Sequence, residues 1–210
     1  MPSSVSPLFS ILSRLKLIQR WSLMRSTVPE NVQEHSHRVA CIAHALAVIG
    51  SRVFGKRINA ERAALLGLYH GAGEALTGDL PTPVKYANPE LRDAYAKIED
   101  AARDRMLAMT PEALREDFRP LFFPAPADAD EQRLVYAADK ICAWLKCVEE
   151  RRGGNHEFLQ AEATLRAKVA GLDLPEAAYF VEHFAPAFEL TLDELESTRN
   201  FAVARSENCR

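Results

Sequence analysis

The feature that most constrains the fold is the spacing of apolar residues after Pro29. Through residues 32–53 they recur at alternating steps of three and four, which is the period of one face of an α-helix. The stripe comprises Val32, His35, Val39, Ile42, Leu46, Ile49 and Val53, with His35 as its one ionisable member. The other long segments share this period, and none alternates as a strand does. The sequence therefore predicts an all-α protein.

Helix caps and breakers divide the rest of the chain. Thr110-Pro111 and the capping box Thr191-x-x-Glu194 indicate helix starts, whereas Pro120, Pro124 and Pro126 indicate a loop. One helix is expected to end at Arg20-Trp21, and others are expected over 32–53, 59–76, 90–109, 130–152, 155–169 and 175–184. Two more are expected to begin at the start signals at Thr110-Pro111 and at Thr191. Together they predict a single-domain bundle of roughly eight helices in residues 1–196, followed by a polar tail over 197–210.

The balance of charge limits the classes of partner. The 210 residues include 26 Lys and Arg against 29 Asp and Glu, a net charge of −3. This lacks the positive field of a protein that binds nucleic acid polymers. No stretch approaches the roughly 18 apolar residues of a membrane span, so neither a nucleic acid polymer nor a membrane is an expected partner.

The four cysteines form neither a CxxC pair nor a framework of short spacings, which predicts a reducing, cytoplasmic location. One alternative stays open. Residues 1–29 contain no Asp or Glu but four basic residues, namely Arg14, Lys16, Arg20 and Arg25. That composition is also typical of a transit peptide.

Three potential metal ligands point inward from three expected helices. His35 lies on the apolar stripe, His70 follows Leu66 by one turn, and Asp139 adjoins the apolar stripe of residues 130–152. Each alone is explained by an ordinary buried hydrogen bond. Burying an unpaired Asp costs several kcal/mol, however, and a cation shared with two imidazoles offsets that cost. The pattern predicts a site for Mn, Co, Fe, Ni or Zn, without choosing among them.

Two further groups could serve chemistry beside such a metal. Glu74 follows His70 by four residues, on the same face of the expected helix, where it could move a proton or simply pair with a basic side chain. The loop over 77–83 carries two hydroxyls and a carboxylate between prolines, which suits either ligand contact or an ordinary turn. Arg20-Trp21 presents a cation and a flat aromatic ring, which can contact a phosphate and a sugar or base.

Four runs of the sequence resemble the bacterial HD-domain 5′-deoxynucleotidases, members of the HD superfamily of metal-dependent phosphohydrolases. The resemblance as a whole covers about three quarters of the chain, its runs follow one another in the expected order, and TGDLPTPVK is specific to that group. The runs are RLKLIQRWSLMR (14–25), ENVQEHS (30–36), LYHGAGEALTGDLPTPVKY (68–86) and AADKICAWLKCVEE (137–150). The resemblance implies an all-helical homodimer that hydrolyses deoxyribonucleoside 5′-monophosphates with a divalent metal such as cobalt or manganese.

The resemblance also implies roles for individual residues. His35, His70 and Asp139 would be metal ligands. Arg20, Glu74 and Asp79 would be catalytic, with Arg20 orienting the phosphate and the two acids handling protons. The substrate would be bound by Arg20, by Trp21 on the sugar side, and by Asp79, Leu80, Pro81 and Thr82.

One position departs from the family pattern, because Gly71 stands where the family has the Asp of its His-Asp pair. Three explanations stay open: an engineered replacement that silences catalysis, natural loss of activity with binding retained, and a working site with three protein ligands. Glu74 could compensate in part. The expected function is thus a deoxynucleotidase that Gly71 weakens or inactivates, and the alternatives are a catalytically silent nucleotide-binding homodimer and a helical interaction domain.

Overall fold

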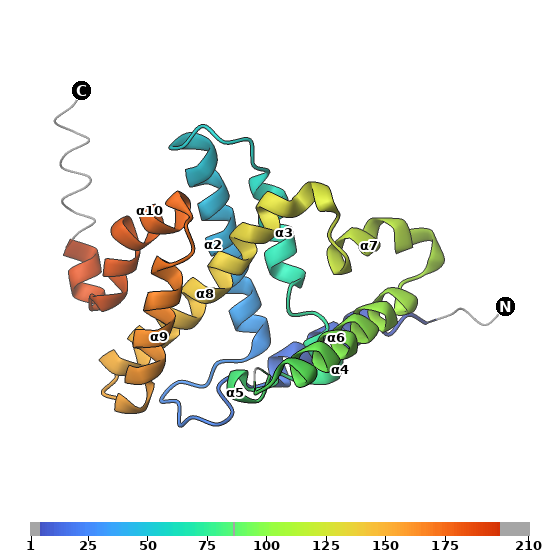
Figure 1. Cartoon of the computed structure of the whole chain (residues 1–210), viewed down its shortest axis with the longest axis horizontal. Coiled ribbons are helices and arrows are strands. Elements are labelled where there is room, and N and C mark those ends of the chain that lie inside the picture. Colours follow the sequence, from blue (N-terminus) through green and yellow to red (C-terminus); the bar gives the residue numbers. More distant parts are fainter. Residues whose placement is uncertain (1–4, 86, 198–210) are drawn as a thin grey trace.

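The described part of the chain is helical, as the apolar period predicts. The computed structural model describes residues 5–85 and 87–197, whose helices are drawn in Figure 1. Within these residues the only strand pairing is an isolated bridge between Gln19 and Asn31. The α-helices are α1 (Leu8–Leu12), α2 (Val32–Arg52), α3 (Ala60–Tyr69), α4 (Glu74–Thr77), α5 (Thr82–Lys85), α6 (Pro89–Met109), α7 (Arg115–Phe122), α8 (Ala129–Arg152), α9 (Leu159–Ala170) and α10 (Pro175–His183). The 3₁₀ helices are η1 (Ser13–Leu17), η2 (Glu112–Leu114), η3 (Pro126–Asp128), η4 (His156–Phe158) and η5 (Ala185–Glu189).

Helix α2 begins where a capping box fixes its first turn. The Asn31 side chain accepts a hydrogen bond from the Glu34 amide, and the Glu34 side chain accepts one from the Asn31 amide. These bonds pair two of the main-chain donors that a helix start leaves open. The stripe predicted over residues 32–53 is buried from Val32 to Ile49, so α2 lies where the sequence places it.

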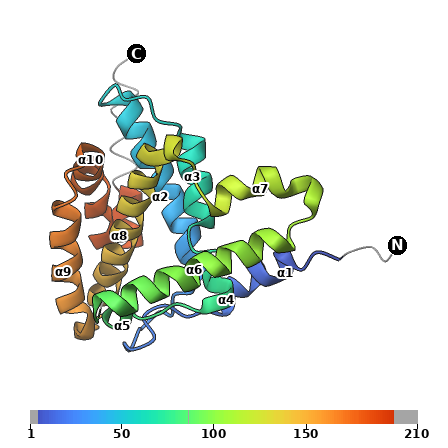
Figure 2. The same ribbon diagram turned by 45° about the vertical axis from the view of Figure 1, so that its right-hand side comes forward.

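The main core lies between α2, α3, α8 and α10. Val39 and Leu46 of α2, Ile141 and Leu145 of α8 and Phe180 of α10 belong to one buried cluster. Figure 2 shows α9, α8 and α2 side by side, with α6 crossing below them. Helix α8 is the central element because it packs against α2, α3 and α9.

A second, smaller cluster joins α1, α6 and α7 to the segment between α3 and α4. Its buried members are Leu8, Ala72, Met106, Leu107 and Phe122. Ala72, in the segment over residues 70–73, thus belongs to the second cluster, whereas Ala63 and Leu66 of the preceding α3 belong to the main core.

The helix expected over residues 59–76 is interrupted, so that prediction was wrong. Helix α3 ends at Tyr69, residues 70–73 form a turn, and α4 begins at Glu74. Gly67, Gly71 and Gly73 weaken a helix here, since each glycine costs roughly 1 kcal/mol relative to alanine. The break also places Ala72 in the second cluster.

Three other boundaries differ from the predictions. Arg20 and Trp21 follow η1 in a loop and do not end a helix, and Pro120 lies inside α7 instead of in a connecting loop. The 77–83 loop ends at Pro81, because α5 starts at Thr82.

The capping box at Thr191 is present, and residues 192–197 are helical. Of the tail predicted over 197–210, residues 198–210 lie outside the described part. Among the described helices, none has both the length and the apolar character needed to cross a bilayer.

Candidate active site

The structure brings together the three predicted metal ligands. His35 lies near the start of α2, His70 directly follows α3, and Asp139 lies in the middle of α8. One ligand atom from each lies within 4.8 Å of the others. His35 is 1% exposed, and its Nε2 lies 3.1 Å from Oδ1 of Asp139.

The hydrogen bonds around these residues favour the protonation states that metal ligands need. The Nδ1 of His70 lies 2.6 Å from the carbonyl oxygen of Gly67, to which it donates, so its Nε2 keeps a free lone pair. Desolvation, and next the charge of His35, lower the pKa of His70 to about 4, which makes this imidazole neutral at pH 7. Burial alone would raise the pKa of Asp139, but the His35 hydrogen bond and the charge of Lys140 hold it well below its usual range.

The residues present fit a divalent metal. Two ligands on one first-row ion stand roughly 3–4 Å apart, so atoms within 4.8 Å of one another need only small adjustments to share one. The carbonyl that fixes the His70 ring is the usual partner of a metal-binding imidazole. Two imidazoles and a carboxylate suit Zn, Mn, Fe and Co alike.

The charges of four carboxyl groups act on one cation, Arg20, and one of the four is the candidate ligand Asp139. Burial, and next the charge of Asp79, raise the pKa of Glu74 to about 8. Burial also raises the pKa of Asp79, although the charge of Arg20 opposes this. Burial would lower the pKa of Arg20, but the charges of Glu30, Asp139, Asp79 and Glu74 outweigh it and raise the value. At neutral pH Glu74 therefore holds a proton that it can give up.

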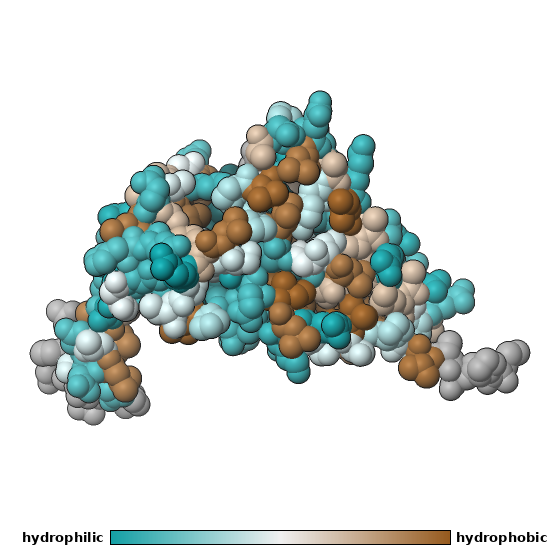
Figure 3. All heavy atoms as spheres, turned by 90° about the horizontal axis from the view of Figure 1, so that it is seen from below, coloured by the Kyte–Doolittle hydropathy of each residue, from teal (hydrophilic) through white to brown (hydrophobic). Residues whose placement is uncertain are grey.

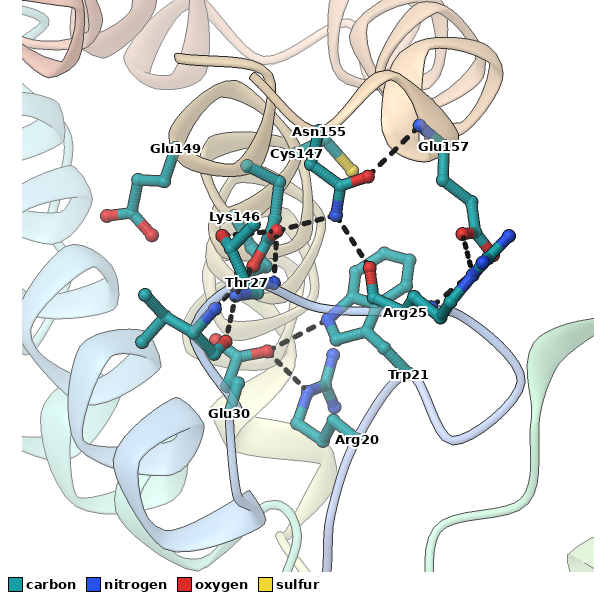
Figure 4. A network of polar contacts seen from close by, with 12 residues as sticks. Arg20, Trp21, Arg25, Thr27, Glu30, Lys146, Cys147, Glu149, Asn155 and Glu157 are labelled. Carbon is teal, nitrogen blue, oxygen red and sulfur yellow. Dashed lines mark hydrogen bonds and ion pairs between the residues drawn. The ribbon is translucent and has the colours of Figure 1, made fainter. Parts of the chain in front are cut away.

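The loop that carries Arg20 and Trp21 is held by a residue that the sequence analysis missed. Oε2 of Glu30 accepts hydrogen bonds from Nε of Arg20 and Nε1 of Trp21, each at 3.0 Å (Figure 4). Glu30 is 7% exposed. One signal could have found it: Glu30 is the first acidic residue of the chain, after four basic ones.

The other predicted substrate-binding residues lie around the turn after α4. Gly78 adopts a φ of 73°, which favours glycine, and its carbonyl accepts a hydrogen bond from the hydroxyl of Tyr95 at 3.2 Å. Asp79, Leu80 and Pro81 are half-buried, whereas Thr82 is exposed. The charge of Asp79 in this turn contributes to the raised pKa of Glu74.

Comparison with known proteins decides the family. Residues 7–188 match the family described as "5'-deoxynucleotidase YfbR-like". The chain belongs to this YfbR-like family. It is 55% identical over 190 residues to a 5'-deoxynucleotidase of Vibrio cholerae, covering 90% of this chain and 98% of that protein. A 5'-deoxynucleotidase of Photorhabdus laumondii is 51% identical over 191 residues, covering 91% and 97%.

Solved structures support the HD-domain fold of this YfbR-like protein. An HD-domain phosphohydrolase of Listeria innocua has a TM-score of 0.73 at 23% identity, covering 86% of this chain and 87% of that one. The HD phosphohydrolase of cyanophage S-2L, solved with dA and one catalytic Zn²⁺ ion, has a TM-score of 0.59 at 22% identity and covers 87% and 96%.

Gly71 lies in the turn of this YfbR-like chain, beside the candidate ligands. A Cβ atom added there would lie 3.1 Å from Cγ1 of Val32, 3.2 Å from Oγ of Ser36 and 3.6 Å from Oε1 of Glu74. The Ser36 hydroxyl and Oε2 of Glu74 are buried without a hydrogen-bond partner among the described residues. Polar atoms therefore border the space that a side chain at position 71 would enter.

Proposed function

We propose that this chain hydrolyses deoxyribonucleoside 5′-monophosphates to deoxynucleoside and phosphate with the help of a divalent metal. The observation that carries the proposal is the convergence of His35, His70 and Asp139 beside Arg20 and Glu74. The 5′-deoxynucleotidases at 51–55% identity support the choice of substrate.

The residues of this chain divide the work as follows. Arg20 orients the phosphate, since it keeps both Nη groups free of hydrogen bonds to the described residues while its Nε binds Glu30. As water attacks phosphorus and the bond to the 5′-oxygen breaks, Glu74, protonated near neutral pH, donates a proton to that oxygen. Asp79, whose pKa burial also raises, takes part in proton transfer nearby. Trp21 packs on the sugar, and Leu80, Pro81 and Thr82 line the substrate pocket.

His35, His70 and Asp139 would hold the metal. A bound ion would supply Lewis acidity and neutralise charge on the phosphoryl oxygens. The resemblance favours cobalt or manganese. Elemental analysis of the purified protein would identify the ion that it retains.

A direct test measures phosphate release from a deoxyribonucleoside 5′-monophosphate and from its ribo counterpart, with Mn²⁺ or Co²⁺ present. This protein and its Gly71→Asp variant are compared side by side. We expect release from the deoxy substrate and a faster rate in Gly71→Asp. No phosphate from either protein would overturn the proposal.

Gly71 favours a second candidate, a nucleotide-binding homodimer that does not turn over. Because Gly71 stands where the family has an Asp, the candidate metal site has one negative charge fewer, and we infer that it retains a metal less tightly. Deoxynucleotide binding by calorimetry, with no turnover and no metal in this chain, would support the silent protein. Absence of heat with nucleotides and with divalent ions would leave only a helical interaction domain.

We also infer that the chain forms a homodimer. Large apolar side chains are exposed near the N-terminus, namely Val5, Phe9, Leu17, Leu23 and Val28. Figure 3 shows apolar side chains in clusters between polar ones on the lower face of the molecule. Light scattering coupled to size-exclusion chromatography would check this, and a monomer at micromolar concentration would contradict it.

A cytoplasmic location stays a prediction. Of the cysteines that the structure describes, Cys41, Cys142 and Cys147 are free thiols, and Cys209 lies outside the described residues. The boundary between a domain over 1–196 and a tail over 197–210 also stays a prediction.

A further inference from the structure

The side chains of Arg20 and Trp21 meet at one carboxylate oxygen, Oε2 of Glu30. Main-chain hydrogen bonds join the chain at the same point. The Arg20 amide donates to the Glu30 carbonyl at 2.9 Å, and the Val32 amide donates to the Ile18 carbonyl at 3.0 Å. The two ends of loop 18–31 are thus joined beside Glu30. A carboxylate that accepts two donors while 7% exposed limits both to one arrangement.

Trp21 adopts a backbone conformation that needs such a restraint. Its φ is 58°, in the left-handed region, which is strained for a residue with a Cβ. Its ring packs on Phe158, with the ring centroids 5.3 Å apart, and its indole N–H binds Glu30. Strained residues persist only where their surroundings over-determine them, and they cluster at functional sites.

The part of the loop just before Glu30 is held by a second buried carboxylate, Glu150 of α8. It accepts hydrogen bonds from the amides of Thr27 and Val28, the Thr27 hydroxyl, the side chain of Asn155 and the ammonium of Lys146. Lys146 also donates to the carbonyl of Val28. Glu150 and Lys146 are 1% and 3% exposed, so this end of the loop is firmly fixed to α8.

The same helix carries Asp139, seven residues before Lys146 and eleven before Glu150. Those spacings place the three residues on one side of α8, with Asp139 about 10 Å along the axis from Lys146. One rigid helix therefore sets both the candidate metal centre and the loop that carries Arg20 and Trp21. Within that loop, Glu30 holds the side chains of Arg20 and Trp21 in place.

We propose that Glu30 is a positioning residue that aligns Arg20 with the phosphate and Trp21 with the sugar, and so contributes to discrimination between deoxyribose and ribose. It binds Arg20 at Nε alone and leaves both Nη groups for an anion. It also fixes the Trp21 ring, which by resemblance would lie on the sugar side of the substrate and so limit the room for a 2′-hydroxyl. The kinetic part of this inference rests on the proposed function.

The test is Glu30→Gln, which keeps the shape of the side chain and removes its charge. Hydrogen bonds to charged groups are worth more than neutral ones, so we expect kcat/KM for the deoxynucleotide to fall about 10-fold, mainly through a higher KM. We also expect the ratio of deoxy to ribo activity to fall. The matched control is Glu157→Gln, which removes the loop's other carboxylate pair, with Arg25, and should change neither quantity more than twofold.

A second readout does not depend on turnover. The indole N–H signal of Trp21 in an NMR spectrum, assigned with Trp21→Phe against Trp144, should shift in Glu30→Gln and stay in place in Glu157→Gln. A Glu30→Gln protein with unchanged KM, sugar ratio and Trp21 signal would overturn the proposal, whatever its melting temperature. Absence of turnover in the unaltered protein would contradict the proposed function alone, and the Trp21 signal would then decide the role of Glu30.

Discussion

Two polar regions flank Asp139, and they differ in how far their buried atoms are paired. On the side of loop 18–31, Glu150 accepts five hydrogen bonds, and Glu30 accepts two on a single oxygen. On the side of the turn at 70–73, the Ser36 hydroxyl and Oε2 of Glu74 have no partner among the described residues. A network of paired groups stabilises the fold, whereas unpaired buried atoms are costly and indicate a place where a further group can bind.

The largest expected effect on stability comes from removing Glu150, whose hydrogen bonds hold the fully paired region together. Glu150→Ala removes an acceptor of five hydrogen bonds and leaves the buried Lys146 ammonium without its counter-charge. Removing one partner of a buried pair typically costs about 3–5 kcal/mol, and we expect that loss in the free energy of unfolding measured with urea. The control is the neighbouring Glu149→Ala, which breaks a half-exposed pair with Arg38 and should cost under about 1 kcal/mol.

The same carboxylate predicts a pH dependence. Burial alone would raise the pKa of Glu150, but the hydrogen bonds from Lys146, Thr27 and Asn155 lower it well below the ordinary value. The stabilisation is therefore complete above the unfolded pKa of about 4.3 and is lost as the pH falls toward the folded value. Below pH 4 the free energy of unfolding of the parent protein should therefore fall more steeply with decreasing pH than that of a Glu150→Gln variant. Equal slopes of free energy against pH in the two proteins would contradict this assignment.

The next effect concerns the unpaired side. Gly71→Asp adds a carboxylate where Ser36 Oγ would lie 3.2 Å from the new Cβ, and it should raise the affinity for Mn²⁺ or Co²⁺ at least about 10-fold. Gly71→Ala is the matched control, because it adds the same Cβ without oxygen atoms. Metal content after dialysis, measured by elemental analysis, separates the two. Equal metal content in both variants would show that position 71 does not reach the ion.

A smaller effect follows from the protonation of Glu74. Its pKa of about 8 lies above the ordinary 4.5, so the metal-free folded protein binds this proton more tightly than the unfolded chain does. The free energy of unfolding should then decrease as the pH rises from about 4.5 to about 8. Glu74→Gln should raise the melting temperature at pH 8 and leave it unchanged at pH 4. Calorimetry would check this, with the exposed Glu61→Gln as a control that moves neither value.

The smallest effect belongs to the pair between Arg25 and Glu157. The side chain of Arg25 is 95% exposed, so solvent screens the pair. Arg25→Ala should change the free energy of unfolding by less than about 0.5 kcal/mol in urea titrations, although Arg25 lies in the same loop as Thr27. A loss of stability as large as that of Glu150→Ala would contradict the expectation that exposed contacts of this loop stabilise the protein less than buried ones.

Long helices with clear caps were predictable from the sequence. The apolar stripe and the glycines at 153–154 place α2 and α8 within one or two residues, and those helices bring His35 and Asp139 together. The turn at residues 70–73 was missed because the apolar period continues across it. The glycines at 67, 71 and 73 weaken a helix there, and the packing of Ala72 with Leu8 and Met106 of other elements, which the local sequence does not report, adds to the preference for a turn.

Glu30 was missed for a related reason. Nothing in the local pattern reports that Trp21 takes a left-handed backbone or that its indole and Arg20 meet on one oxygen. Contacts of this kind depend on how a loop folds back on itself, and loops lack the periodic signal that helices provide. Candidate ligands on helices were therefore easier to place than the residue that aligns Arg20.

The common support that α8 gives to Asp139, Lys146 and Glu150 has a consequence for local unfolding. The amide of Thr27 is released only when its bond to Glu150 opens, and that bond belongs to the same helix as the candidate ligand. In hydrogen exchange, the Thr27 amide should therefore behave as part of the central bundle and share the opening energy of the α8 amides. A surface loop would in this way acquire the slow exchange of a core helix.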